Sequence, residues 1–333
     1  MADAFFSIVV PAYNAENYIS ACIESVLNQT FKDWQLLIVN DGSTDKTETI
    51  IKHYAALNKR ISYISKENGG VSSARNTALC SANGQYLIFL DADDYLSNNA
   101  LEIINQYIKC DSTQLLLFGI NLINTKKGTE VELNKNKKFV NCENEVSLFS
   151  VLQLTPYACD KVYDLSIIRR FNIKFCEGVK IGEDLRFTLE YLAYTSKITF
   201  IPDVLYNYRW GIGVTSSIKK IAISFTDDDF HSALNAIVSL IDLYRRKIDS
   251  QRLHVFMGGL YYWNLFHRNN VLQSLIYMDR RRRKKIVSRI IKGDFSSIGP
   301  CMRLFIFMHY CPDFLRTQFN RLLYKMRFLL MSE

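Results

Sequence analysis

The fold is decided by a short stretch at residues 84–94, which reads GQYLIFLDADD. Its centre, residues 86–90, is almost wholly apolar, and such a run predicts a strand that is buried on both faces. Asp91 and Asp93 follow this strand directly. Two carboxylates at the end of a buried strand are unfavourable unless a positive group lies beside them. A divalent cation that also binds phosphates would supply that charge, and a solvated acidic turn is the alternative.

Strands and helices alternate on both sides of this stretch, with short connections between them. Apolar runs predict further strands at residues 5–10, 34–39 and 61–65. Helical periodicity and start signals predict helices over residues 15–28, 45–57, 71–82 and 97–109. This order is typical of a parallel sheet that is covered by helices on both faces, so we expect an α/β fold.

Polar residues at the strand ends are the candidates for chemistry. Ligands of open α/β sheets bind beyond the carboxyl ends of the strands, so residues 11–14, 40–43 and 91–94 should share one edge. Asp41 could accept from a nucleobase or a ribose there, although turn chemistry explains residues 43–45 equally well.

Two helix starts add polar groups. The segment ENGGVSSARN at residues 67–76 offers a glycine turn, free N–H groups for an anion, and Arg75 one turn further on. Glu183 and Asp184 stand at the start of another predicted helix. The alternatives are an ordinary glycine-started helix with a surface arginine and a simple N-terminal cap.

The composition is that of a globular protein. The chain has 333 residues, 48% of them hydrophobic and 22% charged. No apolar run approaches the roughly 20 residues of a membrane-spanning helix, and no basic segment precedes an apolar stretch as in a secretory signal. Eight cysteines without a CxxC pair favour reduced thiols in a cytosolic protein over a disulfide framework or a zinc site.

Charge divides the chain into two predicted regions, residues 1–217 and 218–333. Residues 218–333 carry 20 basic and 9 acidic side chains, and residues 1–217 carry 21 basic and 24 acidic ones. Residues 114–217 have a mixed α and β pattern, in which the polar segment 121–144 predicts a surface hairpin or mobile loop. The second region has a helical, aromatic and basic pattern, and such asymmetry points to an anionic partner.

Taken together, the motifs resemble those of the family 2 glycosyltransferases, which are inverting enzymes of the GT-A fold, and in particular the bacterial surface-polysaccharide type. The matching stretches are VVPAYNAENYISACIESVLNQTF (9–31), LLIVNDGSTDKT (36–47), ENGGVSSARNTAL (67–79), GQYLIFLDADD (84–94) and GEDLRF (182–187). The resemblance implies a nucleotide-sugar-binding domain over residues 1–217, with a mostly parallel sheet flanked by helices.

The resemblance also implies a donor site. Asp41 would pair with the base, usually uracil, and Asp91 would lie near the ribose or the sugar. Asp93 of this DXD motif would bind Mn²⁺ or Mg²⁺, with Asp91 beside it. The donor-site residues that it implies are Pro11, Tyr13, Asn14, Asp41, Asn68, Gly70, Arg75, Asp91, Ala92 and Asp93.

The implied reaction moves a hexose or an N-acetylhexosamine from a UDP-sugar to a hydroxyl group of a glycan or glycolipid acceptor. Asp184 would be the catalytic base, with Glu183 as its neighbour. Less specific stretches place Lys161, Tyr208 and Arg209 near the acceptor and the diphosphate. Many relatives carry a histidine shortly after the Tyr-Arg pair; here Trp210-Gly211-Ile212 stands in its place, so no histidine ligand is assigned.

Two rival functions make different demands on the sequence. A nucleotidyltransferase should have a glycine-rich phosphate loop in the first strand–helix turn, but residues 12–15 contain no glycine. A non-catalytic scaffold that binds sugar nucleotides should have lost the metal or base carboxylates, yet Asp93 and Asp184 are both present.

The basic second region adds an expectation about location. Residues 280–285 read RRRRKK, and residues 301–331 interleave basic with apolar side chains. Helices of this composition can lie in a membrane interface, which would make the protein peripheral on the inner face of the cell membrane. The alternatives are a solvated basic face or a homo-oligomer contact. No recognised nucleic-acid-binding module is present, so we expect no nucleic acid partner.

Overall fold

The structure is a computed structural model that describes residues 4–110, 113–125, 128–133, 157–179, 182–195, 197–210 and 212. The basic region 218–333, the boundary predicted before it, and residues 134–144 of the polar segment lie outside the described residues. What the sequence predicts for them therefore stays a prediction.

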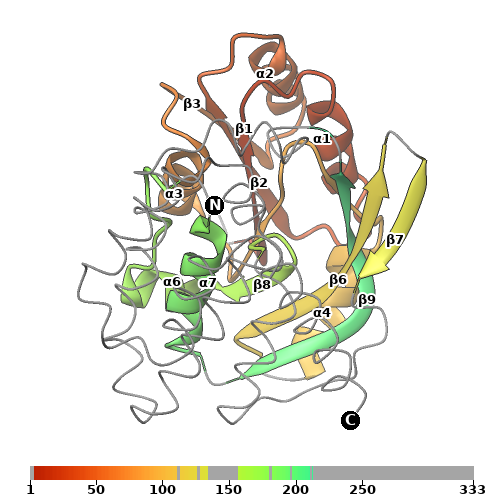
Figure 1. The fold of residues 1–333 in the computed structure, drawn as a ribbon, viewed down its shortest axis with the longest axis vertical. Coiled ribbons are helices and arrows are strands. Elements are labelled where there is room, and N and C mark those ends of the chain that lie inside the picture. Colours follow the sequence, from red (N-terminus) through yellow and green to blue (C-terminus); the bar gives the residue numbers. More distant parts are fainter. Residues whose placement is uncertain are drawn as a thin grey trace, which may run out of the picture. The chain divides into compact units, whose positions relative to one another are not determined.

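The first half of the domain follows the predicted alternation of strands and helices (Figure 1). Its elements are β1 (Phe6–Ala12), α1 (Ile19–Leu27), β2 (Trp34–Asp41), α2 (Thr47–Leu57), β3 (Ile61–Lys66), α3 (Val71–Ser81) and β4 (Tyr86–Phe89). Helix α1 begins four residues later than the periodicity predicts. The reason is that the Ala15 N–H donates to Thr47 Oγ1 at 2.7 Å, which ties this turn to α2.

The second half mixes helices with antiparallel strands, as its pattern predicts. Its elements are β5 (Tyr95–Leu96), α4 (Ala100–Cys110), β6 (Leu115–Asn124), β7 (Thr129–Leu133), β8 (Lys161–Asp164), α6 (Leu165–Phe171), α7 (Glu183–Leu192) and β9 (Ile198–Trp210). Strands β6 and β7 pair antiparallel and form the first part of the hairpin expected in the polar segment.

All these strands join one sheet in the order β3-β2-β1-β4-β8-β6-β9-β5, with β7 paired to β6. The pairings among β3, β2, β1 and β4 are parallel, as expected. Beyond β4 the sheet is mixed, because β8 runs antiparallel to both β4 and β6, whereas β6 and β9 are parallel. The mostly parallel sheet of the prediction is therefore confined to the first half.

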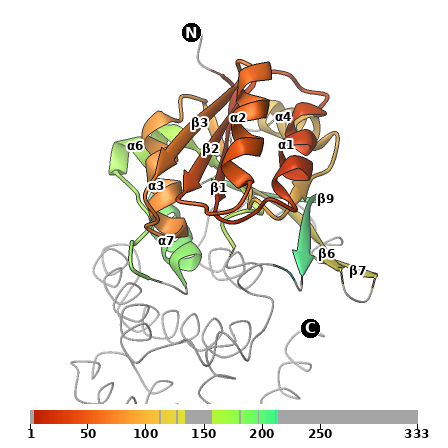
Figure 2. The same cartoon turned by 90° about the horizontal axis from the view of Figure 1, so that it is seen from above.

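Helices cover both faces of the sheet. Helices α1, α2 and α4 lie on one face and α3, α6 and α7 on the other (Figure 2). On the first face, Ile8 and Val10 of β1 belong to the same buried core as Ile23 of α1. On the second face, Phe89 packs edge-on against the rings of Phe175 and Phe187, at centroid distances of 5.1 and 5.5 Å. Burial on both faces explains why β1 and β4 are almost wholly apolar.

The parallel registers bring the carboxyl ends of β1, β2 and β3 to one edge of the sheet. Asn40 pairs with Ala12 across β1 and β2, and Asp41 pairs with Lys66 across β2 and β3. This confirms the shared edge that the sequence predicts. Among the described residues, no helix is both long and apolar enough to cross a bilayer.

Candidate functional site

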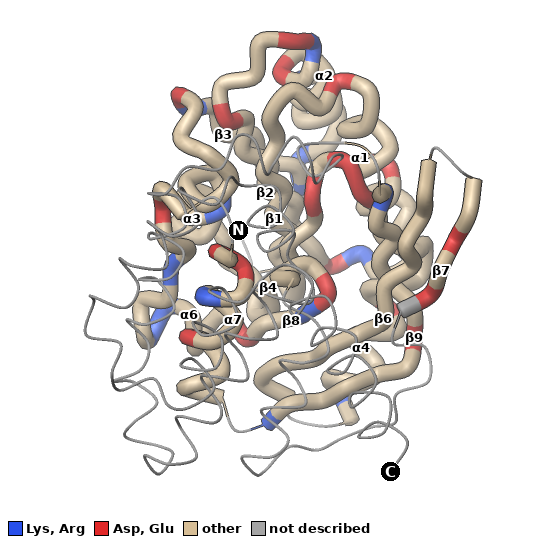
Figure 3. The backbone as a smooth tube through the Cα atoms, in the orientation of Figure 1, with Lys and Arg blue, Asp and Glu red and all other residues tan. Residues whose placement is uncertain are grey.

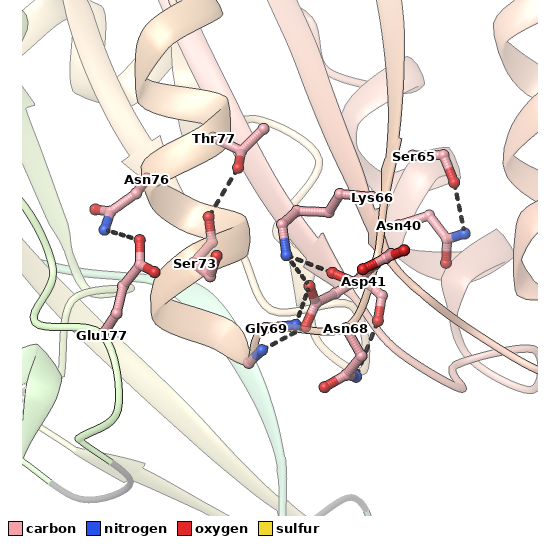
Figure 4. Close-up of polar contacts among 12 residues, drawn as sticks. Asn40, Asp41, Ser65, Lys66, Asn68, Gly69, Ser73, Asn76, Thr77 and Glu177 are labelled. Carbon is pink, nitrogen blue, oxygen red and sulfur yellow. Dashed lines mark hydrogen bonds and ion pairs between the residues drawn. The ribbon is translucent and has the colours of Figure 1, made fainter.

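The Asp41 carboxylate is held by three groups at the end of β2 and β3, and a fourth group holds the Asp41 backbone (Figure 4). Oδ1 accepts from Lys66 Nζ at 2.7 Å and from the Gly69 N–H at 3.0 Å, and Oδ2 accepts from the Gly70 N–H at 2.7 Å. Asn68 donates from its side-chain amide to the Asp41 carbonyl oxygen at 2.9 Å. Three predicted donor-site residues, Asp41, Asn68 and Gly70, thus lie together, and the carboxylate is fixed before any ligand arrives.

The backbone of this cluster needs glycine at two places. Gly70 has φ +86°, a left-handed conformation that glycine adopts without strain. Gly42 has φ +73°, and a Cβ there would lie 2.8 Å from the Asn68 backbone nitrogen. The Asn-Asp-Gly-Ser turn after β2 therefore packs against the glycine loop after β3.

The end of β1 contributes a loop that is fastened to the loop after β2. The Asn14 N–H donates to Ser43 Oγ at 3.0 Å, and Asn14 Oδ1 accepts from the Thr44 N–H at 2.8 Å. Pro11 is buried in β1, while the Tyr13 side chain is 51% exposed at this edge. Tyr13 is thus available to a ligand, whereas Asn14 uses its amide oxygen to join two loops.

Arg75 lies between two carboxylates that are far apart in sequence. Its Nη1 donates to Asp184 Oδ1 at 2.5 Å, and its Nη2 donates to Asp91 Oδ1 at 2.9 Å. The arginine is buried, and the rings of Phe89 and Phe175 lie near its guanidinium. The sequence groups Arg75 with the Asn68–Gly70 turn. In the structure it instead joins the candidate catalytic base to the carboxylate after β4.

The two carboxylates at the start of α7 titrate differently from free ones. Burial raises the pKa of Glu183 to about 8, and the neighbouring charge of Asp184 adds to the effect. Burial also raises the pKa of Asp184, but the Arg75 charge, the Ala158 N–H and the Lys161 ammonium oppose that rise. These three groups favour the ionised form of Asp184, which is the form that a general base needs.

The turn after β4 is anchored by its last acid. Asp94 is buried, and its carboxylate accepts from the Tyr206 hydroxyl at 2.7 Å and from the Arg209 N–H at 2.8 Å. The Tyr206 oxygen in turn accepts from the Asp91 N–H at 3.1 Å. Strand β9 thereby fixes the turn that carries Asp91 and Asp93, and Ala92 between them is buried.

The Asp93 carboxylate suits a divalent cation. Burial, followed by the Asp91 charge, raises the pKa of Asp93 to about 6, and the Arg209 charge offsets only part of that rise. Within the described ranges, no three His, Cys, Asp or Glu side chains gather to hold a metal by themselves. Mg²⁺ is usually held by one or two carboxylates together with substrate phosphates. Asp93 and Asp91 therefore fit an ion that is completed by a diphosphate.

The three less specific residues have different surroundings. Arg209 lies beside the acidic turn, where its Nη1 donates to the Asp93 carbonyl oxygen at 3.1 Å. Tyr208 stacks on Tyr157, with ring centroids 6.0 Å apart. Lys161 is fully buried and pairs with Asp160 at 2.5 Å, so it stabilises the interior behind Asp184 and has no exposed face for an acceptor.

Sequence reasoning missed three residues of this site, namely Lys66, Asp94 and Tyr206. Lys66 had a usable signal, because it directly follows the predicted third strand, at the same edge as Asp41. Asp94 was visible as the third acid of the turn. Tyr206 stands in the same stretch as Tyr208 and Arg209, but its bond to Asp94, 112 residues earlier, had no signal in the sequence. Figure 3 shows that acidic and basic residues are interspersed along the described backbone.

The chain is similar to known proteins both in sequence and in fold. Residues 7–159 match the family model described as glycosyl transferase family 2. The minor teichoic acid biosynthesis protein GgaB of Bacillus subtilis is 34% identical over 260 residues, which are 76% of this chain and 28% of GgaB. The uncharacterized glycosyltransferase EpsJ of the same organism is 31% identical over 207 residues, 61% of this chain and 60% of EpsJ.

A solved structure of Staphylococcus aureus TarS, residues 1–349 in complex with UDP-GlcNAc, superimposes with a TM-score of 0.72. The two sequences are 22% identical, and the match covers 88% of this chain and 81% of that one. This likeness shows the shared fold. The chain spans less than two thirds of the length of both curated relatives above.

Proposed function

The chain belongs to glycosyltransferase family 2 through residues 7–159, and on this premise we propose that it transfers a sugar from a UDP-sugar to a hydroxyl group of a cell-surface glycan. The observation that carries the proposal is the Arg75 bridge. The guanidinium of Arg75 contacts both Asp184, which has the properties of a general base, and Asp91. Asp91 belongs to the acidic turn that would hold the donor.

We propose that Asp184 removes the proton of the acceptor hydroxyl. The oxygen then attacks the anomeric carbon from the face opposite the nucleoside diphosphate, and the configuration inverts in one displacement. A single base suffices, because a diphosphate whose charge is neutralised leaves without being protonated. General-base catalysis of this kind contributes about 10²–10⁴-fold to the rate.

The donor would lie along the edge of the sheet. Asp41 would accept from the base and Tyr13 would face it, while Asp91 would lie near the sugar. A Mn²⁺ or Mg²⁺ ion held by Asp93 and Asp91 would neutralise the diphosphate. Arg209, which donates beside Asp93, is a protein cation at the same end of the site.

Relatives support the choice of sugar and acceptor. TarS is described as a poly(ribitol-phosphate) β-N-acetylglucosaminyltransferase, and GgaB as a minor teichoic acid biosynthesis protein. We propose an N-acetylhexosamine as the sugar and an anionic surface glycan, lipid-linked or polymeric, as the acceptor. The excess of basic residues in region 218–333 suits such an acceptor and an anionic membrane surface.

We place the protein at the cytoplasmic face of the membrane on the same grounds. The test is co-sedimentation with vesicles that contain anionic lipids, at low and high salt. Binding that is lost at high salt supports this placement. No binding at low salt removes it and leaves the acceptor as the partner of the basic region.

The donor assignment is tested by a thermal-shift panel of UDP-, GDP-, CMP- and dTDP-sugars, each with and without Mn²⁺. We expect stabilisation by one UDP-sugar, dependent on the metal and lost in Asp93→Ala. Asp33→Ala, which alters an exposed acid before β2, is the matched control and should respond as the wild type does. Failure of every nucleotide sugar to stabilise the wild type would refute the proposal.

A further inference from the structure

The Asp41 carboxylate has little accepting capacity left for a ligand. A carboxylate offers about four lone-pair sites, two on each oxygen. Oδ1 uses both of its sites, for Lys66 Nζ and the Gly69 N–H, and Oδ2 uses one for the Gly70 N–H. One lone-pair site on Oδ2 therefore remains for a ligand. Figure 4 shows the contacts that Asp41 already makes.

The Lys66 ammonium has the opposite property, because it retains one donor. An ammonium carries three N–H donors. Two of them point to Asp41 Oδ1 at 2.7 Å and to the Glu67 carbonyl oxygen at 2.6 Å. Among the described residues the third has no partner, and the Lys66 side chain is 22% exposed. The cluster thus offers a ligand one acceptor and one donor side by side.

We propose that Lys66 is a specificity-determining residue that reads the base of the donor together with Asp41. Asp41 Oδ2 accepts the single N3–H of a uracil ring, and Lys66 donates its third N–H to a ring carbonyl oxygen next to that N3–H. This inference rests on the proposed function, since it concerns the donor's base, and it adds a residue that the sequence motifs do not single out.

The free sites of the cluster select among bases. Cytosine has a lone pair at N3, which would face the Asp41 carboxylate without a proton between them. Guanine presents two adjacent donors, N1–H and the N2 amino group, whereas only one acceptor site is free. An unpaired polar group in a desolvated site is costly, so both bases should bind less tightly than uracil. Thymine carries the same imide edge and is not distinguished by this pair.

Gly69 is part of the same arrangement. A Cβ at this position would lie 2.8 Å from Lys66 Nζ and 2.9 Å from Ser73 Oγ. The ammonium therefore occupies the space that a side chain at residue 69 would need. The absence of that side chain lets Lys66 reach Asp41 and the edge of the site at once.

The test measures binding of UDP and of altered bases to the full chain by isothermal titration calorimetry, with Mg²⁺ present. The analogues are 2-thio-UDP and 4-thio-UDP, which weaken one carbonyl acceptor each, and N3-methyl-UDP, which removes the N–H donor. CDP and GDP complete the set. The variants are Lys66→Met, which keeps the length but removes the donor, and Lys66→Arg, which keeps a charged donor. Lys59→Met changes an exposed lysine before β3 and is the matched control.

For wild type and Lys59→Met, we expect one thio analogue and N3-methyl-UDP each to bind about tenfold more weakly than UDP, as expected for a hydrogen bond to a charged group. In Lys66→Met the thio analogue should bind as tightly as UDP does, while N3-methyl-UDP should still bind about tenfold more weakly than UDP. If Lys66→Met does not fold, Lys66→Arg should still alter the ratio between UDP and that thio analogue.

Three results would overturn the inference. Equal binding of UDP and both thio analogues by the wild type would show that no carbonyl is read. If the thio analogue still binds more weakly than UDP in Lys66→Met, Lys66 does not contact the base and serves only to hold Asp41. In both cases UDP still binds, so the proposed function stands. Failure of the wild type to bind UDP at all would instead refute the proposed function, and this inference with it.

Discussion

The guanidinium of Arg75 donates to the carboxylate of Asp184, a residue 109 positions later in the chain. The same guanidinium donates to Asp91, so one buried cation neutralises two carboxylates of the site. Arginine suits this place because its planar, forked group can bond to both carboxylates at once.

Arg75→Lys should therefore reduce activity more than a conservative change usually does. A lysine can reach one carboxylate but cannot span both, which leaves the other without a partner. We expect at least a tenfold loss in kcat and a loss of stability of about 2 kcal/mol. Breaking a fully buried ion pair costs about 3–5 kcal/mol, and the loss here is smaller because both carboxylates are partly exposed. Chemical denaturation and steady-state kinetics measure the two effects. Wild-type kinetics in Arg75→Lys would contradict this role.

The pH dependence of the reaction should show the coupled pair at the start of α7. Because Asp184 acts ionised and burial raises its pKa, kcat/KM should fall as the pH drops below that raised value. Glu183, with a pKa of about 8, should add a second step near pH 8. Glu183→Gln should remove the step near pH 8 and retain the acid limb. Asp184→Asn should lose about 10²-fold or more at every pH. A profile from pH 5.5 to 9.5 in which Asp184→Asn stays active would assign the base elsewhere.

Asp93→Asn should make the metal-free protein more stable while abolishing metal-dependent donor binding. The pKa of Asp93 is about 6 in the folded protein and near 3.9 in an unfolded chain, so the folded state binds the proton more tightly. Its ionisation therefore lowers stability progressively as the pH rises from about 4 to 6.

At pH 7.5 we expect Asp93→Asn to raise the Tm by a few degrees, from a gain on the order of 1–2 kcal/mol. Below pH 4 the two proteins should melt alike. Calorimetric melts at both pH values with EDTA present measure this difference. A lower Tm for the variant at pH 7.5 would mean that Asp93 already has a compensating partner.

Tyr206→Phe should loosen the acidic turn. The hydroxyl donates to Asp94 and accepts from the Asp91 N–H, and its removal leaves both groups short of a partner inside the protein. We expect a loss of stability of about 1–3 kcal/mol and weaker metal-dependent binding of UDP. Tyr107→Phe, which removes a partly buried hydroxyl that bonds to Asp203, is the control and should leave UDP binding unchanged. Unaltered UDP binding in a destabilised Tyr206→Phe protein would limit the residue to a structural role.

Gly69→Ala should displace the Lys66 ammonium while leaving the stability of the fold almost unchanged. The atoms nearest to a new Cβ are the flexible end of Lys66 and the Ser73 side chain, both of which can move. We expect a change in unfolding free energy of about 1 kcal/mol or less and a severalfold loss in UDP affinity. Gly42→Ala is the contrast, because it combines a φ of +73° with a backbone contact and should destabilise the protein itself.

The sequence was sufficient for the features that depend on local pattern. Apolar runs and helical periodicity located β1 to β4 and their helices, because β1, β2 and β4 are buried along almost their whole length and each helix has an apolar face. The edge with Asp41 and Asp91 followed from strand direction alone. Strands β6, β8 and β9 were harder, since their parallel and antiparallel pairings depend on partners that are distant in sequence.

The partners of individual side chains could not be predicted in the same way. Arg75 follows the glycine loop in sequence but meets Asp184 because α3 and α7 cover the same face of the sheet. Lys161 stands in a polar motif, yet β8 lies between β4 and β6 and buries its ammonium. Such contacts are fixed by the packing of whole elements, which a local motif does not report.

The long sequence separation of Arg75 from Asp184, and of Asp91 and Asp94 from Tyr206, has a consequence for how the protein is made. At about 5–20 residues per second, the ribosome delivers Asp184 about 5–20 seconds after Arg75. During that interval a nascent chain already holds Asp41, Lys66 and the acidic turn, but lacks the base and the strand that anchors the turn. In the proposed function, the residues that would hold the nucleotide are therefore synthesised before the base and the strand that complete the site.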